Sequence, residues 1–138
     1  PALYRWAASR GGVFVNPALT EPFGLTLLEA SSCGLPIIST NDGGPKEIRS
    51  KCENGLLVDV TDINELKVIL EKGISNNNQW KIWSRNGIEG VNRHFSWNTH
   101  VRNYLSVLNE EFSSSNSYSS SDIKQSCLKG TSSLIKPH

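Results

Sequence analysis

The 138-residue sequence lacks any apolar run that approaches the about 20 residues needed for a membrane-spanning helix. Residues 1–10 also lack the basic head followed by an apolar stretch that marks a secretory signal. The chain contains no methionine and begins at Pro1, which favours an excised piece of a longer protein. From these absences we expect no membrane-spanning helix and no membrane association.

The sequence also has no excess of positive charge and few cysteines. Its formal net charge is +1 without a dense stripe of Lys and Arg, so binding to nucleic acid is disfavoured. The three cysteines, Cys33, Cys52 and Cys127, are odd in number and far apart. They fit neither a disulfide framework nor a zinc-ligand spacing, so we expect no metal site and a location in the reducing cytoplasm.

The composition changes sharply near Phe112. Ten of the 26 residues from Ser113 to His138 are serine. Such a segment cannot bury enough apolar surface to offset the entropy lost on ordering, so we expect a disordered serine-rich tail at residues 113–138. Residues 1–112 are expected to form the folded part, which is at most one domain or a piece of one.

Strand and helix signals alternate through residues 1–112. Three short apolar runs are typical of buried parallel strands, and a helical pattern follows each of them. The predicted strands are Gly12–Asn16, Pro36–Thr40 and Gly55–Asp59, and the predicted helices are Gly24–Ser32, Pro45–Ser50 and three more that begin near Asp62, Asn78 and Ser96. This alternation predicts an α/β fold, a parallel sheet with flanking helices. Because three strands are few for a finished sheet, we expect a partial Rossmann-like domain.

The loop between Asn16 and Gly24 lies where the first predicted strand ends and a helix begins. Open α/β sheets bind their ligands at this position. A helix that starts at Gly24 would offer the backbone N–H groups of Gly24, Leu25 and Thr26 without intrahelical partners, and its dipole would favour a phosphate or diphosphate. Gly24 has no Cβ, so an anion can approach the backbone closely.

Two glutamates bracket this predicted anion site. Glu21 precedes the helix, and Glu29 lies about one and a half turns into it. A carboxylate accepts hydrogen bonds, and its two oxygens match the neighbouring hydroxyls of a sugar ring. The pair therefore suits a nucleotide sugar, with one glutamate at the ribose and the other at the transferred sugar. Glu29 could equally be an exposed helical glutamate without a ligand.

Paired carboxyl groups are also typical of glycosidases. That interpretation is less favoured, because the pair flanks a helix start suited to an anion and the nearby sequence shows no apolar pocket for a protonated acid. Gly43 and Gly44 are a weaker candidate for a donor-binding loop. Their alternative role is a tight turn that requires a positive φ.

The motif Glu21-Pro-Phe-Gly-Leu, with Glu29 after seven intervening residues, resembles the donor-site motif of retaining GT-B glycosyltransferases. The longer stretch Gly12–Ala30 is similar to the sucrose-phosphate synthase family in particular. Further segments agree in order and spacing, namely Cys33–Pro36, Asn41–Pro45, Asn54–Asp59 and Phe95–Trp97. The similarity covers residues 2–108. Sucrose synthases are the close alternative, although they usually carry alanine where this chain has Pro22.

The resemblance implies a role for each motif residue. Glu21 would be the catalytic residue and would contact hydroxyls of the donor glucose, while Glu29 would hold the ribose. The substrate-binding set would be Glu21, Phe23, Gly24, Leu25, Thr26 and Glu29. The implied reaction transfers glucose from UDP-glucose to fructose 6-phosphate with retention of the anomeric configuration, giving sucrose 6-phosphate. No cofactor or metal ligand is implied, and Mg²⁺ would act at most as an activator.

The resemblance also implies that the chain is the C-terminal half-domain of a GT-B fold. In the family an Arg and a Lys that grip the diphosphate lie upstream of this segment, and a separate N-terminal domain binds the acceptor. We therefore expect a sugar nucleotide, a sugar phosphate and an N-terminal GT-B domain as partners, and no activity from the isolated chain. Another retaining GT-B transferase or a non-catalytic truncated remnant are the alternatives.

Overall fold

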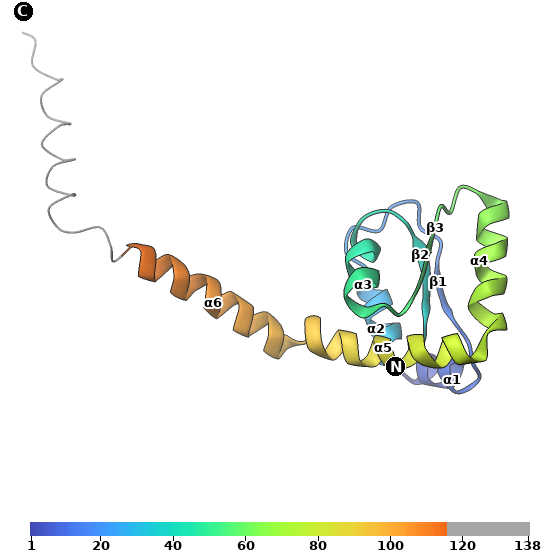
Figure 1. Cartoon of the computed structure of the whole chain (residues 1–138), viewed down its shortest axis with the longest axis horizontal. Coiled ribbons are helices and arrows are strands. Elements are labelled where there is room, and N and C mark those ends of the chain that lie inside the picture. Colours follow the sequence, from blue (N-terminus) through green and yellow to red (C-terminus); the bar gives the residue numbers. More distant parts are fainter. Residues whose placement is uncertain (116–138) are drawn as a thin grey trace, which may run out of the picture. The chain divides into compact units, whose positions relative to one another are not determined.

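The computed structural model describes residues 1–115 and divides the chain into two compact units, Pro1–Thr99 and His100–His138. We describe each unit by itself. The elements in chain order are α1 (Ala2–Ser9), β1 (Phe14–Asn16), α2 (Leu25–Ser32), β2 (Ile37–Thr40), α3 (Gly44–Cys52), β3 (Gly55–Val58), α4 (Ile63–Ser75), α5 (Asn77–His94) and α6 (Trp97–Ser115) (Figure 1).

A parallel sheet with the strand order β1-β2-β3 forms the centre of the first unit within the described residues. Ile37 of β2 pairs with Phe14 of β1 and with Gly55 of β3. Helices α2 and α3 lie on one face of the sheet and α4 lies on the other (Figure 1). These observations confirm the predicted α/β class, with a parallel sheet between flanking helices.

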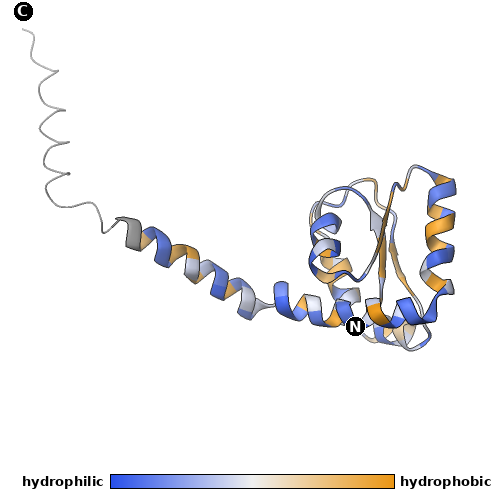
Figure 2. Cartoon of the chain, in the orientation of Figure 1, coloured by the Kyte–Doolittle hydropathy of each residue, from blue (hydrophilic) through white to orange (hydrophobic). Residues whose placement is uncertain are grey.

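Strand β2 is buried along its whole length because helices cover both of its faces. Side chains alternate between the faces of a strand, so neighbouring residues meet different helices. Ile37 packs in the cluster formed with α2 and α3, whereas Ile38 meets α4 at Gly73, where a Cβ would lie 2.6 Å from Ile38 Cδ1. Figure 2 accordingly shows the strands as mostly hydrophobic and the helices as mixed.

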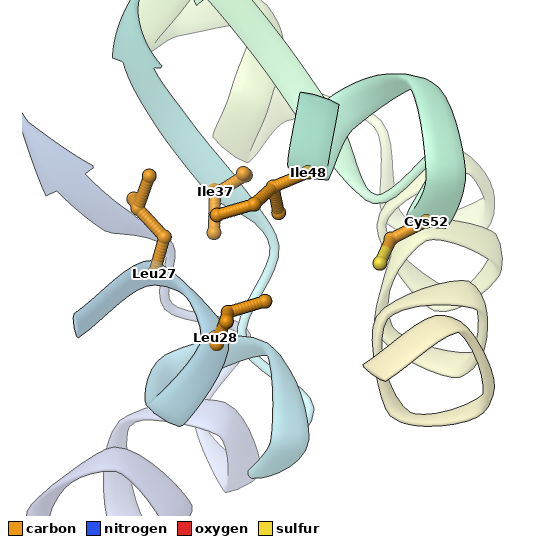
Figure 3. Packing of buried hydrophobic residues seen from close by; sticks show 5 residues of the cluster. All are labelled: Leu27, Leu28, Ile37, Ile48 and Cys52. Carbon is orange, nitrogen blue, oxygen red and sulfur yellow. The ribbon is translucent and has the colours of Figure 1, made fainter. Parts of the chain in front are cut away.

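The core cluster between the sheet and the α2–α3 layer consists of Leu27, Leu28, Ile37, Ile48 and Cys52 (Figure 3). Burial raises the pKa of the Cys52 thiol to about 11, and the Lys51 ammonium opposes this only in part. The thiol therefore stays protonated near neutral pH and packs as a small apolar group. This cluster holds the buried side of α2 in place.

Helix α5 approaches α2 and α3 closely at two glycines. A Cβ on Gly87 would lie 3.2 Å from the carbonyl oxygen of Ser31, and one on Gly90 would lie 2.7 Å from Cys52 Cα. Both glycines are buried. The absence of side chains at these positions lets the helices pack at short range.

The N-terminal helix α1 was not predicted from the sequence. None of its eight residues is buried, and its N-cap, Pro1, makes no side-chain capping bond. Its contact with the sheet includes an edge-to-face pair between Tyr4 and Phe14, with ring centroids 5.5 Å apart. The segment lacks a capping residue, but its Ala, Leu and Arg residues favour a helix, a signal that the sequence analysis did not use.

Helix α6 continues past the predicted boundary at Phe112 and ends at Ser115. Its start agrees with the prediction, because the hydroxyl of Ser96 accepts a hydrogen bond from the Thr99 N–H at 3.3 Å. Ser113–Ser115 thus belong to a helix and not to a tail. The predicted disorder of residues 116–138 lies outside the described residues. No helix within residues 1–115 is both long and apolar enough to cross a membrane.

We predict that Gly90→Ala destabilises the protein, although alanine is the better helix former by about 1 kcal/mol. The added methyl would collide with Cys52, and overpacking of this kind costs about 1–3 kcal/mol. Asn92→Ala, at an exposed position in the same helix, is the control and should leave the free energy of unfolding unchanged or slightly raised. Urea unfolding of both variants measures the difference. Equal stability of the two variants would contradict the packing described here.

Candidate functional site

The loop after β1 is organised by Asn16, the last residue of that strand. The Asn16 side-chain oxygen accepts a hydrogen bond from the Ala18 N–H at 3.1 Å. The Asn16 side-chain nitrogen donates to Glu21 Oε2, also at 3.1 Å. The first of the two predicted glutamates is therefore held by a residue to which the sequence analysis assigned no function.

The other oxygen of Glu21 turns back toward the start of α2. Glu21 Oε1 accepts hydrogen bonds from the Gly24 N–H at 3.0 Å and from the Phe23 N–H at 3.4 Å. This corrects the expectation that the Gly24 N–H is free for an anion, because the carboxylate of Glu21 already occupies it. The N–H groups of Leu25 and Thr26 have no acceptor among residues 1–115, as expected for the first turn of a helix.

Gly24 is the N-cap of α2 and not its first helical residue. Its φ of 92° and ψ of 42° are in the left-handed region, which glycine adopts without strain. A Cβ at this position would also lie 2.9 Å from Leu27 Cδ1 and 3.0 Å from Ile48 Cδ1. The glycine thus lets the loop enter the helix directly above the core cluster.

Gly43 and Gly44 contact the same loop through the backbone. The Gly44 N–H donates to the carbonyl oxygen of Glu21 at 2.9 Å, and Glu21 and Gly43 form an isolated parallel bridge. Gly43 has a φ of 74°, and a Cβ there would collide with the Glu21 carbonyl. The predicted second loop therefore lies directly against the predicted first one.

Glu29 lies on the exposed side of α2. Leu27, Leu28, Ala30 and Ser31 form the buried side of this helix, which packs against the core. Leu25, Thr26, Glu29 and Ser32 are exposed, and they follow the spacing of three and four residues that defines one helix face. The second glutamate thus lies on the exposed side of the helix whose first turn carries the two unpaired N–H groups.

A pocket of about 220 Å³ lies beside Glu29. Its other lining residues come from the N-terminal segment and the end of α2, namely Pro1, Tyr4, Arg5, Ser32 and Cys33. Sequence reasoning missed Tyr4 and Arg5, because it did not predict α1. Their spacing from Glu29 along the chain offers no local signal of the contact.

A larger pocket of about 320 Å³ lies between the end of α3 and α5. Its lining mixes cationic and anionic groups, among them Lys51, Arg93 and Glu89, and it contains none of the predicted site residues. Within residues 1–115, no three His, Cys, Asp or Glu side chains gather as potential metal ligands. The site at the start of α2 is therefore the one in which the geometry agrees with the sequence motifs.

Comparison with protein families gives one matching description. Residues 8–90, more than half of the chain, match the family model "Glycosyl transferases group 1". The matched range includes both glutamates, the N-terminal turn of α2 and the Gly43–Gly44 loop.

The chain is also similar to curated proteins. It is 50% identical over 106 residues to sucrose-phosphate synthase 4 of Arabidopsis thaliana, an alignment that covers 77% of this chain and 10% of the relative. It is 49% identical over 105 residues to a sucrose-phosphate synthase of Zea mays, with 76% and 10% covered. The chain thus spans about a tenth of the length of these relatives.

Among solved structures, the sucrose-phosphate synthase of Thermosynechococcus elongatus superposes with a TM-score of 0.67 at 31% sequence identity. The match covers 82% of this chain and 28% of that one. This structural neighbour has the GT-B architecture, which confirms the predicted fold class for the present chain.

We predict that Gly43→Ala destabilises the protein more than Gly11→Ala does. Both glycines have a positive φ, 74° and 72°, which alanine adopts only with backbone strain, and the ψ of −142° at Gly43 lies outside the left-handed helical region. A Cβ at Gly11 meets no atom within 4 Å, whereas one at Gly43 collides with the Glu21 carbonyl. We expect an additional loss of about 1 kcal/mol or more at Gly43, measured by urea unfolding. Equal losses would show that the two loops do not depend on this backbone contact.

Proposed function

The chain belongs to the glycosyl transferases group 1 family, and from this premise we propose that it is the donor-binding part of a hexosyltransferase of sucrose synthesis. The reaction of the whole enzyme is the transfer of glucose from UDP-glucose to fructose 6-phosphate, with retention at the anomeric carbon, to give sucrose 6-phosphate. The bond between this carbon and the diphosphate oxygen breaks, a bond to an acceptor hydroxyl oxygen forms, and UDP and the hydroxyl proton are released.

The observation that carries this proposal is the exposed face of α2. Two N–H groups without acceptors in residues 1–115, those of Leu25 and Thr26, lie at the helix start, and the exposed Glu29 follows about one turn further along the same helix. The N–H groups and the helix dipole attract negative charge, so the diphosphate of the donor would bind there. As the sugar leaves, negative charge grows on the diphosphate, and preorganised donors stabilise it without reorganisation.

Glu21 suits the hydroxyls of the transferred glucose. Its two oxygens accept three N–H hydrogen bonds, from Asn16, Phe23 and Gly24. A carboxylate offers about four acceptor positions, so a sugar hydroxyl can still donate to it. An acid whose two oxygens already accept N–H bonds is arranged as an acceptor and not as a proton donor, which disfavours the glycosidase alternative.

The pocket beside Glu29 suits the nucleoside of the donor. Glu29 offers two adjacent acceptor oxygens for the ribose diol, and Tyr4 and Arg5 line the same pocket. The diphosphate at the start of α2 would then lie between the ribose at Glu29 and the glucose at Glu21. Gly43 and Gly44 support the Glu21 loop by their backbone contact and complete the proposed donor site.

The rest of the catalytic apparatus would come from the remainder of a longer protein. We propose that an N-terminal GT-B domain binds the acceptor and that no cofactor or metal ligand is needed, with Mg²⁺ as an activator at most. The proposed compartment is the cytoplasm, where the free thiols of Cys33 and Cys52 stay reduced.

We predict that Glu29→Ala weakens the binding of both UDP and UDP-glucose at least about tenfold, because hydrogen bonds to a charged group contribute about 1.5–3 kcal/mol. Isothermal titration of the chain with each ligand measures the effect. Glu71→Ala on α4 is the matched control, because it removes the same charge from another exposed helical position. Unchanged binding by Glu29→Ala would refute the ribose assignment, and no binding of either ligand to the unmodified, folded chain would favour a non-catalytic remnant.

A further expected outcome is that the 138-residue chain forms no sucrose 6-phosphate from UDP-glucose and fructose 6-phosphate. The chain corresponds to about a tenth of the length of its curated relatives, and it supplies the donor side of the proposed site alone. Chromatographic detection of the product is the measurement. Formation of sucrose 6-phosphate by the purified chain would overturn the assignment of the acceptor site to another domain.

A further inference from the structure

We infer that Asn16 is the positioning residue that holds Glu21 for the sugar of the donor, an inference that rests on the proposed function. Asn16 is a residue to which neither the sequence motifs nor the family resemblance gave a role. The chain of contacts that supports the inference runs from β1 through one side-chain amide to the Glu21 carboxylate.

The amide of Asn16 is fixed at both of its ends. Its oxygen accepts the Ala18 N–H at 3.1 Å, and its nitrogen donates to Glu21 Oε2 at 3.1 Å. The backbone of Asn16 is fixed as well, because the residue is the last of β1 and pairs with Ser39 of the central strand. The Asn16 amide therefore holds the Glu21 side chain in a fixed position relative to the sheet.

Glu21 is otherwise a long side chain on an irregular segment. Holding such a side chain in one rotamer costs about 1.5–2 kcal/mol of conformational entropy. Asn16 and the N–H groups of Phe23 and Gly24 hold it before any ligand arrives, so this cost does not fall on ligand binding. The result is a carboxylate preorganised toward a hydroxyl-bearing ligand.

Only a side chain with both a donor and an acceptor can make these two contacts. Aspartate has nearly the same shape and keeps the acceptor for the Ala18 N–H, but it would place a second negative charge against Glu21. Serine keeps a shorter acceptor for the same N–H and adds no charge, but its hydroxyl is too short to replace the amide nitrogen at Glu21. Both substitutions therefore keep an acceptor for the Ala18 N–H and remove the hydrogen bond to Glu21.

Loss of the Asn16 contact should weaken the binding of the glucose part of the donor and not that of the UDP part. The proposed contacts to UDP come from the Leu25 and Thr26 N–H groups and from Glu29, and none of these groups bonds to Asn16. A displaced Glu21 should accordingly weaken UDP-glucose binding and leave UDP binding unchanged. A purely structural role of Asn16 would weaken both.

The test is isothermal titration of the full 138-residue chain with UDP and with UDP-glucose, in the unmodified protein and in Asn16→Asp. We expect the ratio of the UDP-glucose Kd to the UDP Kd to rise about tenfold, as for loss of a hydrogen bond to a charged group. The added charge of the aspartate repels the diphosphate of both ligands alike, so it cancels in this ratio. Asn76→Asp is the matched control, because Asn76 uses only its oxygen to cap α5 and an aspartate caps equally well. This control should leave both Kd values unchanged.

Asn16→Ser repeats the test without added charge and should raise the ratio in the same direction. Circular dichroism shows whether each variant folds. If Asn16→Asp does not fold, the ratio measured for Asn16→Ser tests the role of Asn16. An unchanged ratio in a folded Asn16 variant, or an equal loss of both ligands, overturns the inference. If the unmodified chain binds neither ligand, the proposed function fails instead, so the two failures are distinguishable.

Discussion

The backbone contact between two loops is the constraint on which the site depends. The Gly44 N–H donates to the Glu21 carbonyl, and at Gly43 any side chain would occupy the space of that carbonyl. One loop follows β1 and the other follows β2, so the contact joins the carboxyl ends of two neighbouring strands. Because the strands are fixed by the sheet, the loop that carries Glu21 is fixed with them.

Helix α2, which follows this loop, has one buried side and one exposed side. The buried face is held by the core cluster and by a buried polar contact, in which the Asn54 side-chain nitrogen donates to the Ser31 hydroxyl at 2.6 Å. The first N–H groups of the helix, at its end, and the exposed Glu29 stay available to a ligand. Stability and the proposed ligand recognition thus involve different parts of one helix.

The free N–H groups are fewer than a simple helix start would provide. Glu21 itself binds the Gly24 N–H, so the carboxylate is part of the N-terminal cap of α2 as well as a proposed ligand contact. A donor bound at this position would meet an acidic side chain and two backbone donors, Leu25 and Thr26, in a fixed relation. This combination suits a ligand with both hydroxyl groups and phosphates, as the proposed nucleotide sugar has.

The sequence by itself determined the order of strands and helices from β1 onward and the motif residues, but not helix α1. Apolar runs and capping residues such as Asp62 and Ser96 act within a few positions along the chain, so their effect can be predicted locally; both caps are present in the structure. The end of α6 was predicted at Phe112, but the helix continues to Ser115. Serine favours caps and turns, so a serine run gives little local indication that a helix continues.

The tertiary structure alone decided which groups meet. The Asn16 amide reaches Glu21 only because the loop folds back after β1, and Tyr4 and Arg5 line the Glu29 pocket only because the fold brings the N-terminal segment near the end of α2. The occupied Gly24 N–H likewise follows from the rotamer of Glu21. Side-chain direction and contacts between distant elements depend on packing in three dimensions, which a one-dimensional pattern does not contain.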